Sequence, residues 1–158
     1  MDAQPTLQQE LIYRLYADYG RAVLEAQRFE INLGIVLLFL DGRKQSILKK
    51  PAPQEVDALL DELDGKVVGE LLRRLGEHHV PNDPDIIELF NLAARNRNTL
   101  VHHFMKEDVP ALTIEPLDRA IDRVEELGRP IIRAKKAAEA LALQENARMQ
   151  AEIKKPRI

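Results

Sequence analysis

The residues that could do chemistry are concentrated in one short segment, RNRNTLVHHFM, at positions 95–105. The segment holds two arginines, two asparagines and two adjacent histidines. Histidine gives and takes protons near neutral pH, because its unperturbed pKa lies in that range. Arginine stays charged and presents a planar set of donors that matches a phosphate group. With no carboxylate or thiolate in the segment, this combination favours cleavage of an RNA phosphodiester by its own 2′-hydroxyl, a reaction that needs no metal.

Each of these residue types has a role in that reaction. A histidine would move the proton of the 2′-hydroxyl, and an arginine would stabilise the charge that develops on the phosphate. An asparagine would hold an imidazole or a substrate oxygen in place. If the helix that carries the segment pairs with a second copy across a two-fold axis, two such sets converge and supply one acid and one base.

One helix is expected to carry the segment. Asp83 is typical of an N-cap and Pro84 of a first helical position, so the helix should run from Pro84 to about Lys106. At 100° per residue, its core stripe would comprise Ile86, Leu89, Ala93, Asn96, Leu100 and Phe104. The opposite side would carry Arg95, Asn98 and His102, with Arg97 and His103 on the flanks. Apolar residues at Ile87, Ala94 and Val101 predict that the outer side packs against a second copy of the chain, forming a homodimer.

The sequence RNTLVH, from Arg97 to His102, resembles the Arg-Asn-x-x-x-His form of the Arg-x(4-6)-His motif of the HEPN superfamily. That resemblance, which covers roughly residues 10–133, implies an all-α and generally dimeric protein. Many members are metal-independent endoribonucleases of toxin–antitoxin, defence or RNA-processing systems. A toxin of this kind would have a neutralising antitoxin protein as a partner.

By this resemblance, Arg97 and His102 would form the catalytic pair, and Asn98 would be the polar residue beside the arginine. His103 also fits the spacing from Arg97, and Arg95 fits it from His102, so both are expected as auxiliary residues. We prefer the pair formed by Arg97 and His102, because Asn98 then directly follows the arginine.

A second interpretation remains open, because the same signature occurs in HEPN-like helical regulators such as mannitol operon repressor-like proteins. There the motif would be structural: asparagine and histidine would hydrogen-bond across a helix pair, while arginine would cap a carboxylate. The chain would then be a non-catalytic regulatory or protein-interaction module.

The remaining elements are also expected to be helices. Apolar spacing predicts a first helix from about Thr6 to Leu40, with Asp41-Gly42 as its stop signal. Helical patterns follow in QEVDALLDEL and KVVGELLRRLGEHH. A last helix should run from about Leu117 to Ile153, kinked near Gly128 and Pro130. The expected fold is all-α: a HEPN-like helical bundle of four principal helices with a long C-terminal helix.

The last helix becomes polar and alanine-rich along its length. We therefore expect a HEPN-like helical bundle domain at 1–134, and a polar, alanine-rich helical extension with a basic tail at 135–158. Such an extension either stays solvated or docks on a partner.

Two further features bear on RNA binding. The stretch RKQSILKK has four cations and no acid, so it could contact phosphates through Arg43, Lys44, Lys49 and Lys50. The alternative is a solvated loop neutralised by the acidic stretch from Glu55 to Asp64. On the first helix, Gln27 and Glu30 could orient the motif from a neighbouring element, or could be ordinary surface residues.

Composition limits the other possibilities. The 158 residues include no cysteine, which excludes disulfides and thiolate metal sites. Adjacent histidines on a helix point about 100° apart, so neither His78-His79 nor His102-His103 is expected to chelate a metal. We expect no cofactor. The longest apolar run is too short to cross a bilayer and no secretory signal is recognisable, so a cytoplasmic location is expected. The net charge of −3 means that any nucleic-acid binding must use a local basic patch.

Overall fold

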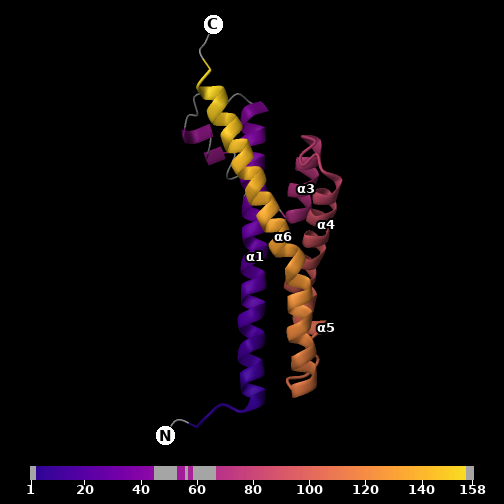
Figure 1. The fold of residues 1–158 in the computed structure, drawn as a ribbon. Helices are drawn as coiled ribbons and strands as arrows, with labels where there is room; N and C mark the ends of the chain where they lie inside the picture. The colour runs from indigo at the N-terminus through magenta and orange to yellow at the C-terminus, as the bar shows by residue number, and fades with distance from the viewer. Residues whose placement is uncertain (1–2, 45–52, 56, 59–66, 156–158) are drawn as a thin grey trace.

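The computed structural model describes residues 3–44, 53–55, 57–58 and 67–155. Its elements are α1 (Leu7–Lys44), α3 (Val68–Glu77), α4 (Pro84–Asn98), a π-helical turn (Thr99–His103), α5 (Phe104–Glu107) and α6 (Ile114–Ile153) (Figure 1). Residues 53–55 and 57–58 are helical as well. Every regular element in these ranges is a helix, which confirms the predicted all-α class.

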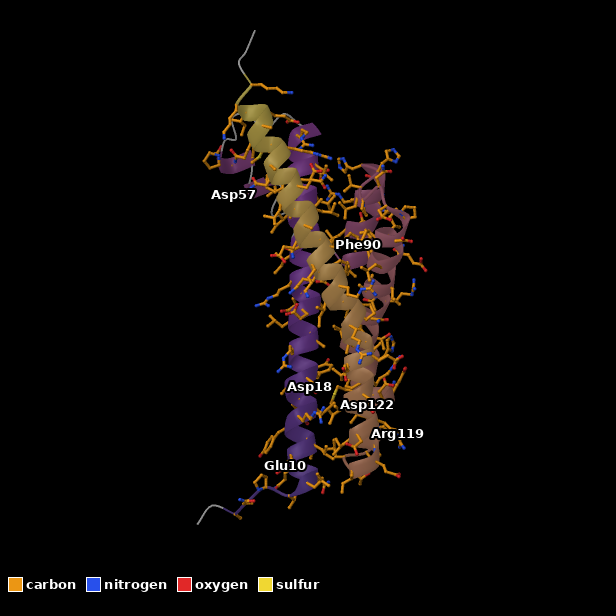
Figure 2. The ribbon with its side chains drawn as sticks, viewed as in Figure 1. Glu10, Asp18, Asp57, Phe90, Arg119 and Asp122 are labelled. Atoms are coloured by element: carbon orange, nitrogen blue, oxygen red, sulfur yellow. The ribbon has the colours of Figure 1, made fainter. Side chains whose placement is uncertain are left out.

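The two longest helices, α1 and α6, run side by side in the same direction (Figure 1). At about 1.5 Å per residue, the 40 residues of α6 span about 60 Å. Their N-terminal ends meet where the Gln8 side chain donates a hydrogen bond to the Leu112 carbonyl, just before α6. At the other end, Arg43 of α1 contacts Glu152 of α6. Charged residues such as Glu10, Arg119 and Asp122 lie on the outer surfaces of the pair (Figure 2).

The helices α3 and α4 form an antiparallel pair beside α6 (Figure 1). The Asp83 side chain accepts a hydrogen bond from the backbone N–H of Asp85 at 2.9 Å, and Pro84 begins α4. The predicted N-cap is therefore confirmed. Farther along α4, Asn96 donates a side-chain hydrogen bond to the Leu127 carbonyl at 3.1 Å, which fixes α4 against α6.

The core lies where α1, α4 and α6 meet. The Phe29 ring of α1 packs against the Phe90 ring of α4, with centroids 5.4 Å apart. Phe90 lies where α4 runs beside α6 (Figure 2). The predicted α4 stripe needs correction, because Phe90 and Ala94 are buried whereas Ile86 and Leu89 are only partly buried. Contacts with α3 as well as with the long helices make the buried face of α4 wider than one stripe.

The predicted end of the first helix at Asp41-Gly42 is wrong. The helix α1 continues to Lys44, and both Asp41 and Gly42 are buried. The Asp41 carboxylate contacts the guanidinium of Arg74 at 2.5 Å and Nε2 of His78 at 2.7 Å. Because these partners come from α3 and from the residue after it, a tertiary contact overrides a local stop signal.

The alanine-rich part of α6 packs against the rest of the molecule. Ala134, Ala138 and Ala142 are buried, and Glu145 is 1% exposed. The Glu145 carboxylate lies 3.0 Å from Arg43 of α1 and 2.9 Å from Arg148. The first part of the predicted extension is thus held by α1, and the boundary at residue 134 stays a prediction. Helix α6 includes Pro130, and its axis changes direction partway along (Figure 1).

None of the helices in the described ranges combines the length and the hydrophobicity needed to cross a membrane.

Candidate active site at the π-helical turn

The predicted motif coincides with a π-helical turn. Residues Thr99 to His103 adopt it, and the N–H of Phe104 donates to the Thr99 carbonyl, five residues back. A π-turn holds one more residue than an α-turn, so residues five apart lie one turn apart. Arg97 and His102 are also five apart, but Arg97 lies on α4, before the π-turn begins at Thr99. Such turns occur often at functional sites, because they change the direction of the side chains within a helix.

Contacts from the neighbouring helix α1 hold the π-turn in place. The Tyr19 hydroxyl donates a hydrogen bond to the Leu100 carbonyl at 3.0 Å. The Tyr19 ring stacks on Phe104, with centroids 5.5 Å apart and an angle of 17° between the rings. Leu100 and Phe104 are almost completely buried. The apolar side of the turn is therefore anchored in the core, while Val101, His102 and His103 are exposed.

Arg97 does not point freely into solvent. Its Nε lies 2.5 Å from Oε1 of Glu30 on α1, and the two side chains are 19% and 21% exposed. Its Nη1 donates to Oδ1 of Asn98 at 3.3 Å. The expectation that Glu30 reaches the motif from a neighbouring helix agrees with this contact, whereas Gln27 is exposed. The guanidinium has further N–H groups that remain available to a phosphate.

The two histidines of the motif differ in their surroundings. His103 Nδ1 lies 3.5 Å from the Glu107 carboxylate. No hydrogen bond or ion pair engages His102 within the described ranges, and its ring centroid is 6.4 Å from that of His103. His102 therefore presents an exposed imidazole without a hydrogen-bond or ion-pair partner in the described part of the chain.

Arg95 and Asn98 border a separate feature, a cavity of about 670 Å³ between α3 and α4. Both side chains are exposed. The structure thus divides the predicted cluster into three parts: Arg97 turns toward α1, the histidines lie on the π-turn, and Arg95 and Asn98 face the cavity. Asn98 links the first and third parts through its contact with Arg97.

Arg43, one of the four predicted phosphate-contacting residues, is not brought to this site. It is 13 residues beyond Glu30 on α1, which corresponds to about 20 Å along the helix. It is paired with two carboxylates of α6, Glu145 at 3.0 Å and Glu152 at 3.4 Å. The Lys44 side chain, Lys49 and Lys50 lie outside the described residues.

Two features were missed in the sequence. One is the buried contact of Asp41 with Arg74 and His78, which the spacing of 33 and 37 residues conceals. The other is the cavity between α3 and α4, where His79 contributes a side chain from a left-handed backbone position with φ of 54°. Gly69 and Gly76, placed seven residues apart, were the only sequence signal for this cavity.

Metal binding has no geometric basis in the described ranges, because no group of three or more histidine or acidic side chains there could hold an ion. No family model, curated protein or solved structure matches the chain.

Proposed function

We propose that the chain is a metal-independent endoribonuclease of HEPN type that acts as a homodimer. The observation that carries the proposal is the exposed His102 on a π-turn, which has no hydrogen-bond or ion-pair partner in the described ranges and lies in the same segment as Arg97, which Glu30 holds in place. His102 would be the general acid or base, Arg97 would bind the scissile phosphate, and Asn98 would position Arg97.

The chemistry is transesterification within the RNA strand. His102 of one protomer takes the proton of a 2′-hydroxyl, whose oxygen attacks the adjacent phosphorus. The bond from phosphorus to the 5′-oxygen breaks, and His102 of the second protomer gives that oxygen a proton. The products are a 2′,3′-cyclic phosphate and a 5′-hydroxyl. The cationic Arg97 stabilises the charge that accumulates on the phosphoryl oxygens between these steps.

A dimer supplies what one chain lacks at this site. The mechanism needs an acid and a base, and one chain presents a single unpartnered imidazole on the π-turn. Two large apolar residues are exposed on the π-turn and α5: Val101 at 41% and Met105 at 41%. Burial of these side chains would favour association of two copies on this side. In a toxin pair, an antitoxin protein would act by covering His102.

The second candidate function is a non-catalytic regulatory or protein-interaction module. The contact between Arg97 and Glu30 favours it, because an arginine that caps a half-buried carboxylate also fits a structural role. The two functions differ in what they require of His102. Catalysis depends on the His102 imidazole. The fold of a non-catalytic module does not depend on it, because this side chain is exposed and makes no hydrogen bond or ion pair in the described ranges.

The test is cleavage of a mixed RNA pool in excess EDTA by the wild-type protein, His102→Ala and Lys106→Ala. Lys106 is the matched control, because it lies on α5 four residues after His102, is also exposed and has no assigned role. We expect wild type and Lys106→Ala to leave cyclic-phosphate ends, and His102→Ala to be slower by about 10²-fold or more.

Equal cleavage by all three proteins would contradict the assignment of His102. Silence from all three, with folding verified by circular dichroism, would favour the regulatory module.

A further inference from the structure

The cavity between α3 and α4 has the size and the lining of a ligand site. Its volume of about 670 Å³ lies within the range of about 300–1,000 Å³ that is common for small-molecule sites. Leu72, Phe90 and Ala94 contribute apolar surface to it. It is distinct from the contact between Arg97 and Glu30, because neither of these residues lines it.

Two glycines keep one wall of this cavity open. Gly69 and Gly76 line it and lie two turns apart on the same side of α3. Glycine within a helix costs up to about 1 kcal/mol relative to alanine. A Cβ atom added at either position would meet no atom within 4 Å, so close packing does not require either glycine. Any longer side chain there would instead take up space at the cavity.

His79, another residue at this cavity, occupies a backbone position that is unfavourable for a residue with a side chain. After α3, the N–H of His79 donates to the Gly76 carbonyl at 3.0 Å, and the N–H of Val80 donates to the Leu75 carbonyl at 3.1 Å. This hydrogen-bond pattern is a Schellman motif, in which glycine usually occupies the left-handed position. His79 takes that position with φ of 54°, and it is one of the residues that line the cavity.

The polar groups of the lining select a particular ligand chemistry. Neither Arg95 nor His79 has an ion-pair partner in the described part of the chain, and no carboxylate is among the described residues of the lining. The other arginine of the lining, Arg73, is paired with Glu70 and Glu77, so Arg95 supplies the uncompensated positive charge of the described lining. Three amides, Asn82, Asn91 and Asn98, add both donors and acceptors. A complementary ligand is an anion that also has an apolar body and an edge with both hydrogen-bond donors and acceptors.

We propose that this cavity binds a nucleoside monophosphate unit. The phosphate contacts Arg95 and His79, the edge of the base meets the asparagine amides, and the face of the base lies against the apolar surface. The unit comes either as a free nucleotide or as one nucleotide of an RNA strand. The proposal does not rest on ribonuclease activity, because it concerns binding and its test measures no cleavage.

The test is isothermal titration of the full chain, in EDTA, with the four 5′-nucleoside monophosphates and with a 2′-O-methyl oligoribonucleotide that cannot be cleaved. Inorganic phosphate and free nucleosides are the ligand controls. Gly69→Leu fills the cavity, and Arg95→Gln removes its cation. Gly20→Leu is the matched control for the first, because Gly20 is also an exposed helical glycine with no atom within 4 Å of a Cβ, and it lies on α1.

We expect Gly69→Leu and Arg95→Gln each to weaken binding by at least about tenfold, with Gly20→Leu unchanged. If these two variants lose binding of a mononucleotide, the cavity is a free-nucleotide site. If they lose binding of the oligoribonucleotide only, the cavity is a site for RNA. Circular dichroism melts verify that each variant is folded.

The absence of binding by every mononucleotide up to about 5 mM and by the oligoribonucleotide would overturn the proposal. Binding that the two cavity variants leave unchanged, or phosphate binding as tight as nucleotide binding, would overturn it too. A loss of RNA cleavage in His102→Ala has no bearing on these outcomes, so the two proposals fail separately.

Discussion

Individual residues in this protein take their roles from the charges that face them. Arg97 and Arg95 are two positions apart, yet Arg97 is held by Glu30 whereas Arg95 has no ion-pair partner in the described ranges. A paired and half-buried arginine has a fixed orientation, which suits a catalytic contact with one phosphate. An exposed arginine without a partner suits ligand capture at a cavity. The same residue type is thus assigned to two different proposed sites.

Glu25 shows the same principle in a stabilising contact, and it predicts how stability changes with pH. Its carboxylate lies 2.8 Å from the Lys135 ammonium, and it is 13% exposed. The hydrogen bond from Lys135 is the largest cause that holds the pKa of Glu25 below its ordinary value of 4.5. Because folding lowers this pKa, the contact stabilises the protein above the unfolded pKa, and that stability is lost as the pH falls through the folded pKa.

We therefore expect Glu25→Gln to lower the melting temperature at pH 7, with a difference from wild type that shrinks as the pH falls below 4.5. Melting curves at a series of pH values measure it. Glu88→Gln is the control, since Glu88 is exposed and has no ion pair within the described ranges. A difference that stays constant down to acidic pH would contradict this account of Glu25.

At the scale of elements, the π-turn reconciles a packing requirement with an exposed motif. Leu100 and Phe104 are both buried, while Val101, His102 and His103 between them are exposed on a turn that holds one more residue than an α-helical turn. A single-residue deletion within the turn is therefore expected to restore a regular α-helix without moving Phe90 or Phe104 out of the core.

Deletion of Val101 tests this view of the π-turn. We expect the variant to keep its helical content and its melting temperature, because α-helical hydrogen bonds replace the less common π-turn. We expect cleavage of RNA to fall by about 10²-fold, since the spacing between Arg97 and the histidines changes. Circular dichroism and the RNA cleavage assay measure the two effects.

Deletion of Asn91, which is also exposed but lies in the regular part of α4, is the matched control. It rotates the following residues by about 100° relative to Phe90, so it should lower the melting temperature strongly. If both deletions lowered the melting temperature by a similar amount, the π-turn would tolerate the loss of a residue no better than the regular part of α4.

At the scale of the whole molecule, α1 is the element that connects the others. It pairs with α6 along its length, it holds the π-turn through Tyr19 and Glu30, and it reaches the end of α3 through Asp41. Two ion pairs join α1 to the C-terminal part of α6: Arg43 of α1 with Glu145, and Lys135 of α6 with Glu25. Stability is therefore expected to be shared between both halves of α6 rather than confined to residues 1–134.

Truncation after Ala134 tests this expectation. The shortened chain loses the buried residues Ala138, Ala142 and Glu145, and it leaves Arg43 without its two carboxylate partners. We expect its melting temperature to fall, because buried apolar area and a nearly buried ion pair are both removed. Truncation after Ile153 is the control. An unchanged melting temperature for the shorter chain would show that residues 1–134 are an independent domain.

The sequence by itself determined the helical class and the start of α4. Local rules suffice there: apolar residues recur at helical spacing, and Asp83-Pro84 provides a cap whose partners are two residues away. It also identified the segment from Arg95 to His103, because residue types with the right chemistry are adjacent in the chain. The contact of Glu30 with Arg97 was anticipated only as one of two alternatives, since 67 residues separate the two.

Only the tertiary structure decided where α1 ends, how the motif is divided and where the cavity between α3 and α4 lies. Asp41-Gly42 is a stop signal until Arg74 and His78 bind the carboxylate, and no local rule contains those partners. Leu100 and Phe104 would share one face of a regular α-helix, so no local rule predicts the π-turn, which contacts with Tyr19 hold in place. The cavity needs two helices and the turn between them, so its lining exists only after packing has brought α3 against α4.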